Sequence, residues 1–242
     1  MGLLSRLLGR EKGPALTCTA IVPAAGQSTR MGEDKLFLPL GETPVILRSL
    51  RALESSRYIT EIIIAAREET MVPLGQLCRE AALTKVRKIV VGGETRSASV
   101  LAGLREADPA SELIAIHDGA RPLVTVDIID AAIEKAAERG AAAPAVPVKD
   151  TVKRAVNGLV TGALDRSELY AVQTPQVFEH GLILGALEKA VSDRVELTDD
   201  CSAVERIGMP VCLTEGSYDN LKITTPEDLA VAEAILERWG LL

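Results

Sequence analysis

The stretch "IVPAAGQSTRMGEDK", residues 21–35, begins as an apolar strand and ends as a loop that holds two glycines, an arginine and a lysine. A glycine loop at the carboxyl end of a first strand lies where open α/β sheets bind their ligands. Its backbone N–H groups can surround an anion, and Arg30 and Lys35 add positive charge. The stretch therefore predicts an α/β sheet with an anion site, against the alternative of a plain surface loop with solvated cations.

The loop matches neither of the two common phosphate-binding signatures. A dinucleotide fold has G-x-G-x-x-G, and a P-loop has G-x-x-x-x-G-K followed by Ser or Thr. Here five residues separate Gly26 from Gly32, Lys35 comes three residues later, and Leu36 follows it. The spacing argues against a nicotinamide oxidoreductase, and the position of the loop, which includes Gly26, still leaves a nucleotide site open.

From Thr17 onward, short β-branched runs alternate with helical patterns, as expected of βαβ units and a mostly parallel sheet. Several runs are apolar on both faces, which is typical of strands that helices cover from both sides. The sequence thus predicts a three-layer α/β fold. The expected strands span residues 18–24, 59–67, 86–92, 112–118, 141–148 and 209–215.

Proline marks the start of two expected helices. Thr43 is the expected cap of the first, with Pro44 as its first helical residue. Thr225 and Pro226 take the same positions in the last helix of the chain.

Residues 150–176 interrupt the alternation. β-prone residues flank Asn157-Gly158, a pair that is typical of a type I′ hairpin turn. The segment holds few large apolar residues and cannot form a core of its own. We expect a protruding β-arm at about 150–170 that packs as an insertion or reaches toward another subunit.

The length of the chain suits one large α/β domain, and residues 17–242 are expected to form it, arm included. Within residues 1–16, the first 13 pair leucines with basic residues but lack the apolar core and cleavage site of a signal peptide. We expect them to form a flexible extension in preference to a membrane or partner anchor.

Composition argues against several classes of function. The net charge of −7 argues against a nucleic-acid partner, because such proteins carry a basic face. No apolar run reaches the roughly 18 residues of a membrane span, so no membrane partner is expected. The four cysteines are widely spaced without a C-x-x-C pair, which favours reduced thiols in a cytoplasmic protein over a disulfide framework or a zinc knuckle.

The motif "HDGARP", residues 117–122, ends another apolar strand with an acid and a base. Asp118 is a candidate ligand of Mg²⁺, which typically binds one or two carboxylates together with substrate phosphates. The alternative is that Asp118 and Arg121 form a salt bridge within the turn. We interpret His117, a single histidine before a turn, as structural.

Two further segments carry candidate nucleotide contacts. "GGETRSAS", residues 92–99, presents Arg96 and Ser99, or else merely starts a helix with Thr95 as its cap. "YDNLKITTPED", residues 218–228, places Lys222 before the last helix, where an isolated lysine is usually a surface residue.

Loops after parallel strands share one edge of a sheet, so these segments are expected to meet. Their convergence would place Arg30, Lys35, Asp118 and Lys222 in one cleft. Cations and a carboxylate together indicate Mg²⁺-assisted phosphoryl or nucleotidyl transfer.

Taken together, the motifs resemble the 2-C-methyl-D-erythritol 4-phosphate cytidylyltransferases of the non-mevalonate isoprenoid pathway, over about residues 18–238. The resemblance implies a Rossmann-like nucleotidyltransferase fold and transfer of a cytidylyl group from CTP to 2-C-methyl-D-erythritol 4-phosphate, with Mg²⁺ as cofactor. One departure is that Asp34 and Leu36 flank Lys35, where the family usually has proline and glutamine. The matching segments are "PAAGQSTRMGEDK", "GGETRSAS", "HDGARP", "PVKDTVKR", "QTPQVF", "TDDCSAVER" and "EGSYDNLKITTPEDL".

The resemblance also implies roles for the matching residues. Arg30, Lys35 and Lys222 would surround the triphosphate as catalytic cations, with Asp118 beside the magnesium. The cytidine pocket, largely made of backbone groups, would comprise Ala24, Ala25, Gly93, Glu94 and Ser99.

The acceptor would be held by residues from two subunits. Asp118, Thr174 and Lys222 would contact methylerythritol phosphate within one subunit. The hairpin would be a dimerisation arm, from which Thr151 and the catalytic Arg166 reach the substrate of the neighbouring subunit.

Two alternatives stay open. One is a cytidylyltransferase for another alditol phosphate, such as ribitol 5-phosphate. The other is a CTP-binding regulator without catalysis, which the presence of all the candidate cations disfavours.

Overall fold

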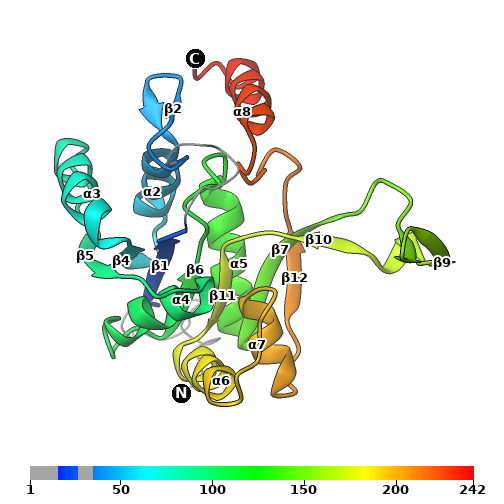
Figure 1. The fold of residues 1–242 in the computed structure, drawn as a ribbon. Helices are drawn as coiled ribbons and strands as arrows, with labels where there is room; N and C mark the ends of the chain where they lie inside the picture. The colour runs from blue at the N-terminus through cyan, green and yellow to red at the C-terminus, as the bar shows by residue number, and fades with distance from the viewer. Residues whose placement is uncertain (1–15, 27–34) are drawn as a thin grey trace.

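The computed structural model describes residues 16–26 and 35–242. They form three layers, with a mixed sheet between two layers of helices (Figure 1). Within these residues the sheet has eight strands, in the order β10-β7-β11-β6-β1-β4-β5, and β12 pairs with the other side of β7. The β1–β4, β4–β5, β1–β6 and β7–β12 pairs are parallel, while β10 and β11 run antiparallel to their neighbours. The expected α/β fold with a mostly parallel sheet is thus confirmed.

The elements follow each other in the order expected of βαβ units. The strands are β1 (Cys18–Ala24), β2 (Pro39–Leu40), β3 (Thr43–Pro44), β4 (Ile59–Ala66), β5 (Val86–Val91), β6 (Leu113–Ile116), β7 (Ala141–Pro147), β8 (Lys153–Val156), β9 (Leu159–Ala163), β10 (Tyr170–Val172), β11 (Gln176–Glu179) and β12 (Cys212–Glu215). The helices are α2 (Val45–Ser55), α3 (Glu68–Glu80), α4 (Arg96–Arg105), α5 (Val126–Arg139), α6 (His180–Ser192), α7 (Asp200–Arg206), α8 (Pro226–Arg238) and the short 3₁₀ helix η1 (Arg166–Glu168).

Helices cover both faces of the sheet, which explains why its strands are apolar on both sides. Alternate residues of β1 show the division: Val22 packs in a cluster with α2, α3 and α5, whereas Ile21 packs in a cluster with α4, α6 and α7. A third, smaller cluster joins α8 to Leu40 and Leu123. The last helix is thereby attached near the edge of the sheet where the first strands end.

Of the two helix starts predicted from proline, one is confirmed and the other is off by one residue. Thr225 caps α8, with Pro226 in its first turn, as expected. The expectation for the first helix is wrong by one residue, because Pro44 pairs with Pro39 in the β2–β3 hairpin and α2 begins at Val45.

The β8–β9 hairpin protrudes from the body as the predicted arm (Figure 1). Asn157 and Gly158 both have positive φ, +49° and +77°, as a type I′ turn requires. Val156, Leu159 and Val160 on the arm are exposed. In the part of the chain that the structure describes, no helix combines the length and apolarity that crossing a membrane requires.

Candidate active site

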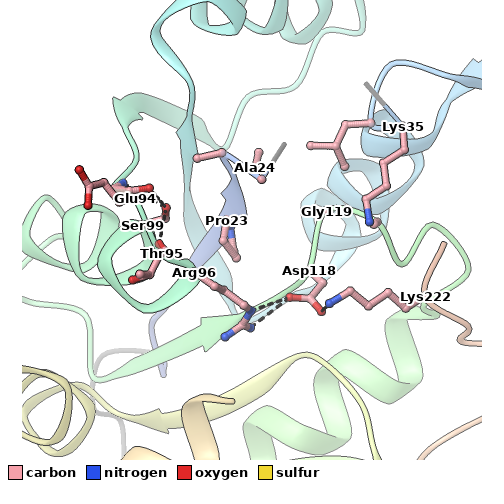
Figure 2. A pocket seen from close by; sticks show the side chains of 15 residues that line it. Pro23, Ala24, Lys35, Glu94, Thr95, Arg96, Ser99, Asp118, Gly119 and Lys222 are labelled. Carbon is pink, nitrogen blue, oxygen red and sulfur yellow. Dashed lines mark hydrogen bonds and ion pairs between the residues drawn. The ribbon is translucent and has the colours of Figure 1, made fainter. Parts of the chain in front are cut away.

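A cavity lies at the carboxyl edge of the parallel strands, where open α/β sheets bind ligands (Figure 2). The end of β1, the β5–α4 loop, the turn after β6 and the segment before α8 all contribute to it. Its lining residues are Pro23, Ala24, Ala25, Gly26, Lys35, Leu36, Gly93, Glu94, Thr95, Arg96, Ser99, Asp118, Gly119, Ala120 and Lys222.

Asp118 links two cations across this cavity (Figure 2). Its Oδ2 lies 2.8 Å from Lys222 Nζ, and its Oδ1 lies 3.1 Å from both Nε and Nη2 of Arg96. The expected alternative partner, Arg121, is farther away, with 4.0 Å between Nε and Oδ2. The turn salt bridge therefore exists, but the shorter ion pairs connect Asp118 to other loops.

The charge of Asp118 follows from these pairs. Burial alone would raise the pKa of its carboxyl, but Arg96 and Lys222 hold that pKa well below its usual range. Asp118 is therefore an anion at neutral pH.

Arg96 pairs with a second carboxylate, that of Asp200. Arg96 is the first residue of α4, whose N-cap Thr95 accepts a hydrogen bond from the Ala98 N–H. Its Nη1 lies 2.7 Å from Asp200 Oδ2. Burial raises the pKa of Asp200 to about 6, while the charge of Arg96 opposes that shift. Arg96 thus connects a carboxylate in the cavity with one beneath the surface.

Lys35 enters the cavity at the end of the glycine loop. Its Nζ donates a hydrogen bond of 2.8 Å to the carbonyl oxygen of Ile223, the residue after Lys222. The next residue, Leu36, is buried in the core cluster with α2, and its carbonyl oxygen accepts a hydrogen bond from the Ile46 N–H. Leu36 therefore anchors the lysine to the core.

Small residues form the side of the cavity opposite these cations. A Cβ on Gly92 would lie 2.6 Å from Ala25 Cβ and 2.9 Å from Ser99 Oγ, so only glycine fits there without a shift. The Gly93 N–H donates a hydrogen bond of 3.1 Å to Ser99 Oγ. This side therefore carries little side-chain bulk, which lets a ligand come close to the backbone, and Ala24 lines it as well.

His117 and Thr174 support the turn that carries Asp118. The Asp118 N–H donates to Thr174 Oγ1 at 3.1 Å, and Thr174 Oγ1 lies 3.0 Å from His117 Nδ1. Burial lowers the pKa of His117 to about 4, so the ring is neutral at pH 7. Because the Arg121 carbonyl oxygen, 3.3 Å from Nε2, can only accept, Nε2 carries the proton and Nδ1 accepts a hydrogen bond from the Thr174 hydroxyl. The structural interpretation of His117 agrees with this geometry.

Three of the described candidates, Thr151, Arg166 and Thr174, do not line the cavity. Arg30 and residues 1–15 fall outside the described residues. Thr151 and Arg166 belong to the arm, both are exposed, and Arg166 Nη1 donates to the Lys149 carbonyl oxygen at 2.7 Å. Thr174 is buried behind Asp118 and is not among the lining residues.

One residue of the site escaped the sequence analysis. Asp200 is the second aspartate of the segment "TDDCSAVER", and the sequence predicts no role for it. The only signal was a charged residue at the start of a short helix, and such residues are usually solvated. Its contact with Arg96 joins positions 104 residues apart and is visible only in the fold.

The arrangement suits a polyanion. Lys35 and Lys222 provide positive charge on one side, and small residues lie on the other. The lining residues within the described part of the chain include no cysteine or histidine that would serve as a nucleophile or a base. The site is therefore built to position charged groups and to stabilise charge, which is what phosphoryl transfer requires.

Comparisons with known proteins agree with this geometry. The sequence model of the 2-C-methyl-D-erythritol 4-phosphate cytidylyltransferase family matches residues 18–238. The protein of that name from Halalkalibacterium halodurans is 44% identical over 220 residues, which cover 90% of this chain and 96% of the relative. The one from Caldanaerobacter subterraneus is 45% identical over 231 residues, covering 92% of this chain and 100% of the relative.

Solved structures give the same result. The 4-diphosphocytidyl-2C-methyl-D-erythritol synthase from Anaerococcus prevotii superposes with a TM-score of 0.83 at 32% identity, covering 92% of this chain and 96% of that one. The 2-C-methyl-D-erythritol 4-phosphate cytidylyltransferase of Thermus thermophilus gives a TM-score of 0.75 at 31% identity, covering 90% and 98%. The chain therefore belongs to the 2-C-methyl-D-erythritol 4-phosphate cytidylyltransferase family.

Proposed function

We propose that this enzyme transfers the cytidylyl group of CTP to 2-C-methyl-D-erythritol 4-phosphate, giving 4-diphosphocytidyl-2-C-methyl-D-erythritol and pyrophosphate. Family membership supports the reaction. The structural observation that carries it is the convergence of Lys35, Asp118 and Lys222 on one cavity that Gly93 also lines.

The chemistry needs no general base. The nucleophile is a phosphate oxygen that is already anionic near neutral pH, and it attacks the α-phosphorus of CTP as the bond to pyrophosphate breaks. The difficulty is to bring two anions together and to stabilise the charge on the nonbridging and leaving oxygens. Lys35 and Arg30 are the proposed ligands of the triphosphate, and Lys222 neutralises the approaching phosphate.

We propose that backbone groups on the side of the cavity opposite Lys35 and Lys222 select cytosine. Cytosine presents an amine donor where uracil presents an acceptor oxygen, so an acceptor of the protein that binds cytosine stays unpaired with UTP. Ala24, Ala25, Gly93, Glu94 and Ser99 are the proposed contacts. Their small size, apart from Glu94, permits the close approach that such contacts need.

Mg²⁺ is the proposed cofactor, with Asp118 as its protein ligand. The donor set fits, because Mg²⁺ commonly binds one or two carboxylates together with phosphate oxygens and water. Oδ1 of Asp118 faces two nitrogen atoms of Arg96, whereas Oδ2 faces Lys222 and keeps a second lone pair that could bind the ion. When bound, the ion would neutralise charge on the triphosphate.

A homodimer through the arm is proposed to complete the acceptor site. Exposed Val156, Leu159 and Val160 on the hairpin support burial against another subunit. In this arrangement Thr151 and Arg166 contact the substrate of the neighbouring subunit, whereas Lys222 contacts the substrate of its own subunit and Thr174 supports Asp118 from behind. We also propose a cytoplasmic location, which its four free cysteines support.

The test is pyrophosphate release from CTP with methylerythritol phosphate and, in parallel, with ribitol 5-phosphate. Faster turnover of methylerythritol phosphate is expected, and replacement of CTP by UTP should reduce it strongly. Preference for ribitol 5-phosphate would overturn the proposed acceptor. Binding of CTP without turnover of either acceptor would indicate a regulator instead.

A further inference from the structure

Four charged side chains of alternating sign form a chain that begins beneath the cavity and ends in its lining. They run from Asp200 through Arg96 and Asp118 to Lys222, with closest distances between charged atoms of 2.7, 3.1 and 2.8 Å. The members come from α7, α4, the turn after β6 and the segment before α8. Only part of this chain, from Arg96 onward, lines the cavity.

The three nitrogen atoms of the Arg96 guanidinium are all engaged. Nε and Nη2 face Asp118 Oδ1, and Nη1 faces Asp200 Oδ2. Burial would lower the pKa of Arg96, but Asp200 and Asp118 raise it above its ordinary value. A guanidinium whose three nitrogen atoms already face carboxylates has few N–H groups left to bind a triphosphate.

Asp200 is built into the protein rather than exposed to a ligand. Its side chain is 1% exposed, and the backbone N–H groups of Asp200 and Cys201 both donate to Gln176 Oε1, at 2.9 and 3.0 Å. Among the described residues, Arg96 is the only cation with which Asp200 forms an ion pair. A buried carboxylate with a single charged partner constrains that partner strongly, because separating the pair leaves an uncompensated charge.

We propose that Asp200 is a positioning residue for nucleotidyl transfer: it holds Arg96 against Asp118, so that Arg96 orients that carboxylate and does not bind CTP. This inference rests on the proposed function. It gives Arg96 a role different from the nucleotide contact expected from its place in the sequence. Asp200 acts on the reaction only through Arg96.

Two rival roles make different predictions. If Arg96 contacts the triphosphate, its loss weakens CTP binding. If Asp200 serves only the stability of the fold, its loss lowers the melting temperature without changing the turnover of the folded protein.

The experiment compares Asp200→Asn, Arg96→Gln and the double variant with the wild-type enzyme, using pyrophosphate release and calorimetric titration of CTP. Asp200→Asn keeps the shape of the side chain and removes its charge. Asp193→Asn is the matched control, because Asp193 also pairs with an arginine, Arg206, but near the surface. Rates are normalised to the folded fraction from thermal unfolding.

Asp200→Asn and Arg96→Gln should each lower kcat at least about tenfold while KM and Kd for CTP stay within about threefold. The double variant should match Arg96→Gln, because residues that act through one another are not additive. A kcat unchanged in folded Asp200→Asn, or a Kd for CTP raised about tenfold or more in Arg96→Gln, would overturn the inference.

The same variants also decide the matter if Asp200→Asn does not fold or if the wild-type enzyme is inactive. If Asp200→Asn does not fold, the double variant, in which neither charge remains, is compared with Arg96→Gln alone, and a further large loss of kcat would refute action through Arg96. A wild-type enzyme that does not turn over methylerythritol phosphate would refute the proposed function and this inference with it. An active wild type with an unaffected Asp200→Asn variant refutes only the inference.

Discussion

Lys35 and Ile223 are 188 positions apart in the chain, yet Lys35 Nζ donates a hydrogen bond of 2.8 Å to the carbonyl oxygen of Ile223. Because Ile223 directly follows Lys222, this bond joins the end of the glycine loop to the segment that carries the second lysine. Lys222 in turn pairs with Asp118. Cations from opposite ends of the sequence thereby line one cavity.

Replacement of Lys35 by alanine should lower kcat by roughly 10² to 10³, by analogy with the loss of one preorganised donor to transition-state charge. The fold should persist, because Leu36 still anchors the segment in the core. Pyrophosphate release measures the rate, and circular dichroism checks the fold. Lys189→Ala, which removes an exposed lysine from α6, serves as the control. Retention of more than about a tenth of the wild-type rate would remove Lys35 from the mechanism.

Gly92→Ala should raise KM for CTP with a smaller effect on kcat. The added Cβ would lie 2.6 Å from Ala25 Cβ, so the β5–α4 loop or the end of β1 must shift, and the proposed nucleotide contacts shift with it. Gly185→Ala is the control, because a Cβ at that glycine of α6 would meet nothing within 4 Å. Equal KM values in the two variants would contradict a nucleotide pocket on this side.

The dependence of stability on pH should reveal two buried groups with opposite signs. The pKa of His117 is lowered to about 4, so the unfolded state binds more protons below the ordinary histidine pKa, and the free energy of unfolding falls as pH decreases from about 6.5 to 4. The pKa of Asp200 is raised to about 6, so the folded state binds the extra proton, and this group stabilises the protein as pH decreases from about 6 to 4.

Each contribution amounts to about 3 kcal/mol at full titration, since one pKa unit corresponds to about 1.4 kcal/mol. Urea unfolding between pH 7 and pH 4 measures the balance. We expect His117→Asn to reduce the loss of stability in acid and Asp200→Asn to increase it. Identical pH slopes in both variants and the wild type would show that neither group titrates as described.

Mixed dimers should recover activity if the arm serves the neighbouring subunit. Lys35→Ala and Arg166→Ala are each expected to be inactive alone. After subunit exchange, half of the dimers are mixed, and one of their two sites has both wild-type residues, so roughly a quarter of the wild-type activity should return. A mixture that stays inactive, although sedimentation shows mixed dimers, would place Arg166 in its own subunit or outside the mechanism.

The sequence predicted the parts of this structure that depend on local patterns. The six expected strands, the Asn157-Gly158 turn and the Thr225 cap follow from side-chain periodicity and turn chemistry, and all are present. The meeting of Lys35, Asp118 and Lys222 also followed, because loops after parallel strands share one edge.

What could not be predicted depends on contacts between distant segments. The Asp118 N–H bonds to Thr174 because β11 inserts between β6 and β7, and nothing in the sequence of β11 specifies those neighbours. The pairing of Asp200 with Arg96 likewise requires α7 and α4 to pack on the same face of the sheet. At Pro44, pairing with β2 prevailed over the local preference of proline for the first turn of a helix.

The register between β7 and β10 has a consequence for how this protein can diverge. Tyr170 pairs with Pro147, and the Val148 N–H still donates to the Leu169 carbonyl oxygen, so the two strands already form a closed ladder at the base of the arm. The residues between this base and the β8–β9 turn pair with no strand of the central sheet, so the length of the arm can change without disturbing a buried strand residue, provided that Thr151 and Arg166 keep their positions. The arm can therefore vary in length without altering the strands that form the cavity.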